Sequence, residues 1–155
     1  MTDFTQILSA ACVDDSLVAA NKKALLQQLA TAMGRRTGYD SKLILASLNE
    51  REKLGSTGFG AGVAIPHGKL DGLPRVLGYF ARLTAPIDFQ AVDGLPVDLV
   101  FLLLSPSDAG ADHLKALAGV SRMLRDRDMV AKLRGARSKD AMFALLSGVE
   151  ALDAA

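Results

Sequence analysis

The segment from Val97 to Leu104 constrains the fold more than any other part of the chain, because it is almost continuously apolar. A strand with one solvent-facing side alternates apolar and polar residues, whereas a strand covered on both faces does not. A second strand is predicted over residues 76–83, and the turn residues Pro86 and Asp93 to Pro96 separate the two strands. Because no helix lies between them, the sheet is not expected to be purely parallel.

Two helical patterns precede these strands. The first begins after Asn21, a residue that caps helices well, and ends at Gly38. The second begins after the capping residue Asp40 and stops at Gly55. The apolar residues of the second pattern are Leu43, Ile44, Leu48 and Leu54.

Three further helical patterns occupy the last third of the chain, and Ser138 caps the final one. Their apolar residues recur at intervals of three or four: Leu114, Leu117, Val120 and Leu124, then Met129, Val130 and Leu133, then residues 141–146. Helices, strands and helices in this order predict an α/β fold, a mixed parallel and antiparallel sheet flanked by helices on both faces. We expect a single domain over residues 1–155, with an ordered core over about residues 5–148.

Charge and cysteine content exclude several classes of protein. The chain carries 18 basic and 17 acidic side chains, so its net charge is +1. Because a nucleic-acid-binding protein needs a basic face, we expect no nucleic-acid partner, although a local basic patch stays possible. The single cysteine, Cys12, cannot form an intrachain disulfide and is expected to be a small buried apolar residue.

No segment resembles a membrane or secretion signal. Residues 1–4 lack a basic region and an apolar core, and the apolar run Leu99 to Leu104 is far shorter than the ~20 residues needed to span a bilayer. We therefore expect a cytoplasmic protein without membrane insertion.

The chemistry is concentrated in a glycine-rich segment over residues 51–69. It matches neither a Walker loop, because Val63 and Leu70 replace the required glycine and hydroxyl residue, nor a dinucleotide-binding fingerprint. Residues 63–65 are predicted to form a short buried strand that Pro66 ends. The sequence thus places His67 in a turn just after a strand.

His67 is the candidate nucleophile. The imidazole of an ordinary histidine has a pKa near ~6.5 and is mostly neutral at physiological pH, so a ring nitrogen is free to attack phosphorus. Gly68 after it would leave room for a bulky group and an amide for an anion. Taken alone, His67 could equally be a polar turn residue.

Four other residues could assist phosphoryl transfer. Arg51 offers a planar fork that suits phosphate oxygens, and Ser56 and Thr57 offer hydroxyl donors. His113, the second histidine, lies at a predicted helix start, where anions are favoured. Each also has a simpler interpretation: Arg51 as a charge at a helix C-terminus, Ser56 and Thr57 as turn residues, and His113 as an exposed residue.

The same segment resembles the phosphorylation site of the IIA components of the bacterial phosphotransferase system, in the fructose, mannitol and nitrogen-regulatory group. The motifs are Arg51-Glu52, Gly55-Ser56-Thr57-Gly58 and Gly62-Val63-Ala64-Ile65-Pro66-His67-Gly68-Lys69, followed by Pro86 to Phe89, Asp93-Gly94, Pro96 to Phe101 and His113-Leu114. The resemblance extends from about residue 5 to residue 148. Gly55 to Gly58 are most similar to the nitrogen-regulatory branch, although that family often has asparagine where this chain has Ala61.

The resemblance implies a function. His67 would accept a phosphoryl group from a phosphohistidine on a small HPr-like carrier, and Arg51 and His113 would stabilise the phosphorylated state. No metal or organic cofactor would be needed. The phosphorylated protein would regulate targets such as potassium transporters or sensor kinases.

Three alternatives stay open from the residues. The protein could be a sugar-specific IIA component that hands its phosphoryl group to a transporter-bound IIB domain. It could be a regulatory binding module whose His67 is not phosphorylated. The two histidines could instead hold a metal ion, although carboxylates would have to complete the ligand set.

Overall fold

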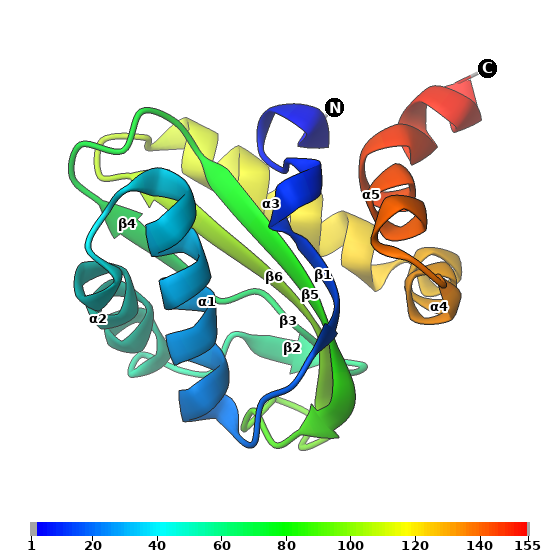
Figure 1. Ribbon diagram of the computed structural model, residues 1–155, viewed down its shortest axis with the longest axis horizontal. Helices are drawn as coiled ribbons and strands as arrows, with labels where there is room; N and C mark the ends of the chain where they lie inside the picture. The colour runs from blue at the N-terminus through cyan, green and yellow to red at the C-terminus, as the bar shows by residue number, and fades with distance from the viewer. Residues whose placement is uncertain (1–2, 155) are drawn as a thin grey trace.

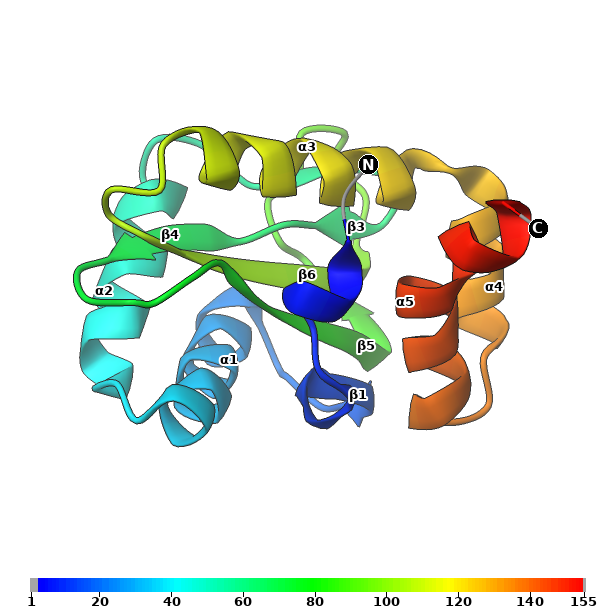
Figure 2. The same cartoon turned by 90° about the horizontal axis from the view of Figure 1, so that it is seen from above.

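The computed structural model describes residues 3–154 and contains one six-stranded sheet with helices on both faces (Figures 1 and 2). The strands run in the order β1-β5-β6-β3-β2. Strand β4 also pairs with β6, farther along the same edge of β6 that β3 contacts. Their bounds are β1 Val13–Leu17, β2 Gly58–Gly60, β3 Val63–Ala64, β4 His67–Leu70, β5 Leu77–Ile87 and β6 Val97–Pro106.

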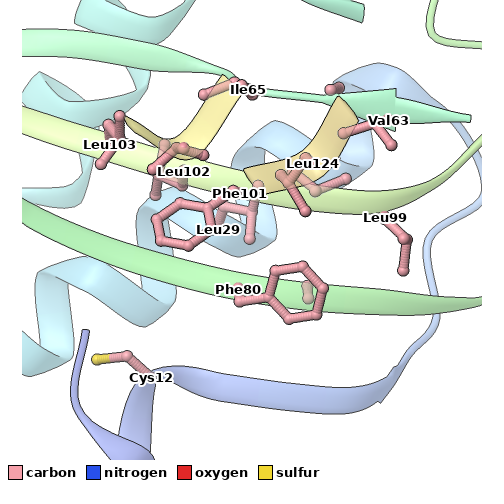
Figure 3. Packing of buried hydrophobic residues seen from close by; sticks show 14 of the residues in the cluster. Cys12, Leu29, Val63, Ile65, Phe80, Leu99, Phe101, Leu102, Leu103 and Leu124 are labelled. Atoms are coloured by element: carbon pink, nitrogen blue, oxygen red, sulfur yellow. The ribbon is translucent and has the colours of Figure 1, made fainter. Parts of the chain in front are cut away.

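Strand β6 lies at the centre of the sheet, as its apolar sequence predicts. It is antiparallel to β5 and parallel to β3 and β4, so the predicted mixed sheet is confirmed. Every residue from Leu99 to Leu104 has no exposed surface. Phe101 of β6 and Phe80 of β5 pack edge to face with ring centroids 6.1 Å apart (Figure 3). Burial on both faces is the reason that the apolar run shows no alternation.

Five helices surround the sheet. Their bounds are α1 Lys22–Thr37, α2 Ser41–Glu52, α3 Ala111–Arg125, α4 Arg127–Gly135 and α5 Lys139–Ala154, and two short 3₁₀ helices, η1 Phe4–Gln6 and η2 Ala10–Cys12, precede β1. Helices α1 and α2 cover one face and α3 covers the other, whereas α4 and α5 lie at one end (Figure 2). None of the described helices has both the length and the apolar character needed to cross a membrane.

The predicted caps position the helices. The Asn21 side chain accepts a hydrogen bond from the Ala24 amide at 2.8 Å, and the Asp40 carboxylate accepts one from the Lys42 amide at 2.9 Å. Gly38 ends α1 with a φ of 79°, a conformation that favours glycine. The caps therefore fix α1 and α2 where the sequence predicts them.

Several expectations about individual elements are wrong. Pro86 lies within β5 rather than in a turn, and Leu43 of α2 is 60% exposed. His67 does not lie in a turn: it begins β4 and pairs with Leu103 of β6. Leu54 lies beyond α2 and is 83% exposed, and Leu114 is 66% exposed because α3 turns the His113 side of the helix toward the sheet. Apolar spacing alone does not reveal which side of a short helix meets the sheet.

Two strands besides β4 are not predicted. Strand β1 has the sequence Val13-Asp14-Asp15-Ser16-Leu17, in which only the first and last residues are buried. It lies at the sheet edge against β5, which explains its polar character. Strand β2 is rich in glycine, and its pairing with β3 rather than its intrinsic propensity makes it a strand. Cys12 is buried, as predicted.

The β2–β3 turn contains a strained residue. Ala61 has a φ of 57°, in the left-handed region that costs a residue with a side chain about 1 kcal/mol or more. The Asp93 carboxylate accepts a hydrogen bond from the Ala61 amide at 2.9 Å, and Arg134 donates one to the Ala61 carbonyl at 2.9 Å. These two contacts hold the turn in place.

Replacing Ala61 by glycine is expected to stabilise the protein. Glycine adopts the left-handed conformation freely, and after its greater entropy in the unfolded chain is subtracted, the free energy of unfolding should rise by about 0.5 to 1 kcal/mol. The same substitution at exposed Ala46, inside α2, should lower it by about 1 kcal/mol. Urea denaturation of both variants and of the wild type checks the prediction, which fails if Ala61→Gly is less stable than the wild type.

Candidate functional site

Two hydrogen bonds fix the protonation state of the His67 ring. Nδ1 lies 2.8 Å from the Ile65 carbonyl oxygen, which can only accept, so Nδ1 carries the proton. Arg51 Nε donates to Nε2 at 3.2 Å, and Nε2 therefore presents its lone pair. The ring is half-buried at the start of β4. The fold thus holds a neutral imidazole with its nucleophilic nitrogen beside a cation.

Arg51 is held from two sides. It lies in the last turn of α2, and its Nη1 donates to the Gly55 carbonyl at 2.9 Å while its Nε contacts His67. The interpretation that Arg51 only complements a helix terminus is therefore incomplete, because its guanidinium reaches the histidine.

His113 lies beside His67. The two ring centroids are 5.5 Å apart at an interplanar angle of 48°. His113 is 6% exposed, so the alternative that it is an exposed residue is wrong. Its Nδ1 lies 2.6 Å from the hydroxyl of Ser105, which is fully buried in β6, and Nε2 is the nitrogen left for another partner. The sequence alone does not identify Ser105 as a site residue.

A surface pocket of about 320 Å³ contains Arg51 and both histidines. The other lining residues are Ser47, Glu50, Leu54, Gly68 and Lys69. Lys69 adds a second cation, and its position two residues after His67 on the same strand was the signal that could have identified it. The pocket has the charge and the donors that an anion of phosphoryl size requires.

Gly68 allows α2 to approach β4 closely. A side chain added at Gly68 would clash with Ser47 Oγ of α2, and this hydroxyl accepts a hydrogen bond from the Lys69 amide at 3.0 Å. The Ser47 side chain thus occupies the space beside Gly68 that the sequence predicts for a bulky group. The proposed contact between the Gly68 amide and an anion stays a prediction.

The hydroxyl groups of Ser56 and Thr57 contact the protein. Ser56 Oγ donates to the Phe89 carbonyl at 3.0 Å, and Thr57 Oγ1 donates to the Glu52 carboxylate. Neither residue lines the pocket that contains His67. In this state they order the loop that follows α2.

Glu52 anchors this loop and was not singled out from the sequence. One of its carboxylate oxygens pairs with Lys22 Nζ at 2.9 Å and accepts from the Thr57 amide at 3.1 Å. The Glu52 side chain is 7% exposed and that of Lys22 is 18% exposed. Because Glu52 directly follows Arg51, the network also positions the arginine.

Replacing Glu52 by glutamine should lower the free energy of unfolding by about 2 kcal/mol, because it leaves Lys22 largely buried without its counter-ion. Glu50→Gln, at an exposed position of the same helix, should change it by less than about 0.5 kcal/mol. Adding Lys22→Met to Glu52→Gln should recover part of the loss, because it removes the unpaired charge. Chemical denaturation measures all three, and equal effects of Glu52→Gln and Glu50→Gln would exclude the network.

The pKa of His67 is lowered, mainly because the ring is buried. The hydrogen bond to the Ile65 carbonyl raises the pKa, the charge of Arg51 lowers it, and the charge of Glu52 raises it. Burial also lowers the pKa of His113, with smaller contributions from the charges of His67 and Lys69. Both imidazoles therefore stay neutral to a lower pH than free histidine.

These shifts predict a pH-dependent stability. As the pH falls through about 6.5, the unfolded chain takes up protons before the folded protein does, so the free energy of unfolding should decrease. The loss should end once both folded-state histidines are protonated. Denaturation between pH 7.5 and 5.5 measures it, and the His67→Gln/His113→Gln variant should show a weaker dependence. An unchanged dependence in that variant would contradict the prediction.

Among the described residues, no three or more histidine, cysteine, aspartate or glutamate side chains gather closely enough to hold a metal ion.

Comparisons with known proteins agree with the fold. Residues 6–149 match the family model of the phosphoenolpyruvate-dependent sugar phosphotransferase system, EIIA 2. A nitrogen regulatory protein of Bradyrhizobium diazoefficiens is 49% identical over 92% of this chain and 94% of that protein. A fructose-specific EIIA component of Haloferax volcanii is 40% identical over 80% of this chain and 79% of its own length.

Among solved structures, nitrogen regulatory protein IIA-Ntr of Neisseria meningitidis has a TM-score of 0.87 and 33% identity, covering 91% of this chain and 97% of that one. The fold is that of the EIIA phosphotransfer components. The chain belongs to the EIIA 2 family of the phosphotransferase system, as its motifs predict, and it is similar to the nitrogen-regulatory members.

Proposed function

We propose that the protein accepts a phosphoryl group on Nε2 of His67 from a phosphohistidine of an HPr-like carrier. The observation that carries the proposal is the hydrogen bond between Nδ1 and the Ile65 carbonyl, which leaves the Nε2 lone pair facing the cationic pocket. In the transfer, the P–N bond of the carrier breaks as a new P–N bond forms at Nε2. No proton has to leave His67, because Nδ1 keeps its own.

Three side chains would stabilise the transferred group. Arg51, already within hydrogen-bond distance of Nε2, would turn its fork toward the phosphoryl oxygens, and Lys69 would add charge. The Ser105 hydroxyl would donate to Nδ1 of His113, so that the His113 Nε2 proton would donate to the same group. This chemistry needs no metal or organic cofactor.

The similarity to nitrogen regulatory proteins supports a regulatory output over sugar transport. In this proposal the protein acts in the cytoplasm, and its phosphorylation state regulates targets such as potassium transporters or sensor kinases. A sugar-specific role is the second candidate, because a fructose-specific component is also 40% identical.

The test is the intact mass of the protein after incubation with phosphoenolpyruvate, enzyme I and an HPr-like carrier. We expect a gain of one acid-labile phosphoryl group, and NMR of the labelled histidine should place it on Nε2. No gain with several carriers, the cognate one included, would overturn the proposal and favour an unphosphorylated binding module. Restored sugar uptake in a strain that lacks its own IIA component would favour the sugar branch.

A further inference from the structure

A second hollow lies away from the histidines, between the β2–β3 turn and the junction of α3 with α4. Its volume is about 510 Å³. Phe59, Leu124 and Val130 supply apolar surface, and Arg125, Arg127 and Arg134 lie around it. We call this hollow the arginine groove.

The arginine groove lies in the most basic part of the chain. Residues 122–139 contain seven basic and two acidic side chains, whereas the net charge of the whole chain is only +1. All seven basic side chains are exposed. In the described part of the chain only Arg134 of these seven forms an ion pair, with Asp98 at 2.8 Å. A near-neutral net charge does not exclude a local basic patch, and these residues form one.

Two of the arginines are held in place before any ligand binds. Arg134 donates to the Asp98 carboxylate and to the Ala61 carbonyl, and the Arg125 guanidinium lies 5.2 Å from the centre of the Phe59 ring. Ordered side chains lose little conformational entropy on binding. Aromatic and arginine side chains at a hollow are also typical of protein interfaces.

The arginine groove is separate from the phosphorylation site. His113 lies in the first turn of α3 and Arg125 is its last residue, so the helix spaces them by roughly 18 Å. A ligand in the arginine groove would leave His67 free.

We propose that the arginine groove docks an acidic segment of a protein partner, with a large apolar side chain between Phe59, Leu124 and Val130 and carboxylates against Arg125 and Arg127. Charge complementarity selects the acidic partner. The apolar floor favours a protein segment over nucleic acid, whose phosphates would not use it. The proposal goes beyond the phosphoryl acceptance proposed above and does not depend on it, because docking needs no phosphoryl group.

The probe is a synthetic peptide, Glu-Glu-Leu-Glu-Glu-Phe-Glu-Glu, titrated into the unphosphorylated, ¹⁵N-labelled full chain. We expect amide shifts at Phe59, Ala131 and their neighbours rather than around His67, and the same shifts in His67→Ala. Peptides with glutamine in place of glutamate, or glycine in place of the two apolar residues, should each bind at least about tenfold more weakly.

Charge reversal supplies the matched control. Arg125→Glu/Arg127→Glu should weaken the peptide at least about tenfold. Arg35→Glu/Arg36→Glu, an equal charge change on exposed residues of α1, should have a small effect. Circular dichroism should show both variants folded, and both should accept a phosphoryl group normally.

Three results would overturn the proposal: equal weakening by the two double variants, shifts centred on His67, or no binding of the acidic peptide. Tighter binding of a DNA duplex that depends on Arg125 and Arg127 would assign the surface to nucleic acid instead. Loss of phosphoryl acceptance together with intact peptide binding would count only against the function proposed for His67.

Discussion

His67→Gln is expected to accept no phosphoryl group at all in the phosphoenolpyruvate assay. Glutamine is similar in size and polar, so the contact with Arg51 can partly persist, but its amide nitrogen has no lone pair with which to attack phosphorus. The loss is therefore complete rather than partial, since His113, the other described imidazole of the site, is buried, whereas the His67 ring is only half-buried. Intact mass spectrometry after prolonged incubation measures it.

The control for this prediction is the neighbouring histidine. His113→Gln should still accept one phosphoryl group, because His113 is buried with its Nδ1 engaged by Ser105 and is not the acceptor. Acceptance should be slower, because the variant loses the His113 hydrogen-bond donor to the phosphoryl group. Both variants should show native circular dichroism. An acid-labile phosphoryl group on His67→Gln, or complete loss in His113→Gln alone, would mean that His113 is the acceptor.

Arg51→Ala is expected to slow phosphoryl acceptance by roughly 10²- to 10³-fold, because it removes the cation that donates a hydrogen bond to His67 Nε2. The charge that develops on the phosphoryl oxygens would then lack its nearest donors. The rate of Arg51→Lys should fall between those of the wild type and Arg51→Ala, since lysine keeps the charge but lacks the planar fork. Stopped or quenched time courses with a phosphorylated carrier measure the rate constants.

Arg35→Ala, at an exposed position of α1, is the matched control and should leave the rate unchanged. The pKa of His67 adds a second measurement, because Arg51 lowers it and Arg51→Ala should raise it toward the ordinary value. If Arg51→Ala accepted the phosphoryl group at the normal rate while the pKa rose, Arg51 would only tune the histidine and would not contact the transferred group.

Local sequence predicted most of the fold. The caps Asn21 and Asp40 and the glycine after α1 depend on contacts within a few residues, so they are visible in the sequence. The central strand β6 was predicted because burial on both faces requires an apolar residue at nearly every position. The sequence does not predict strands β1, β2 and β4, because pairing with neighbouring strands of the sheet, rather than an apolar pattern of their own, forms them.

The candidate site was predicted less completely. The sequence predicts His67, Arg51 and His113 as site residues, and the structure brings all three into one pocket. Lys69 and Ser105 were not identified. Ser105 acts on His113 through a contact across eight positions of the chain, between a strand and the helix that follows it.

By itself the sequence determined which residue types are present, where the helices begin and which strand is central, because these follow from short-range caps and from periodicity. Only the tertiary structure decided which nitrogen of His67 is free, since that depends on the Ile65 carbonyl and on a guanidinium sixteen positions away. It also decided that Glu52, together with the hydroxyls of Ser56 and Thr57, holds the loop after α2. Such contacts join residues that are distant in the chain, and no local pattern records them.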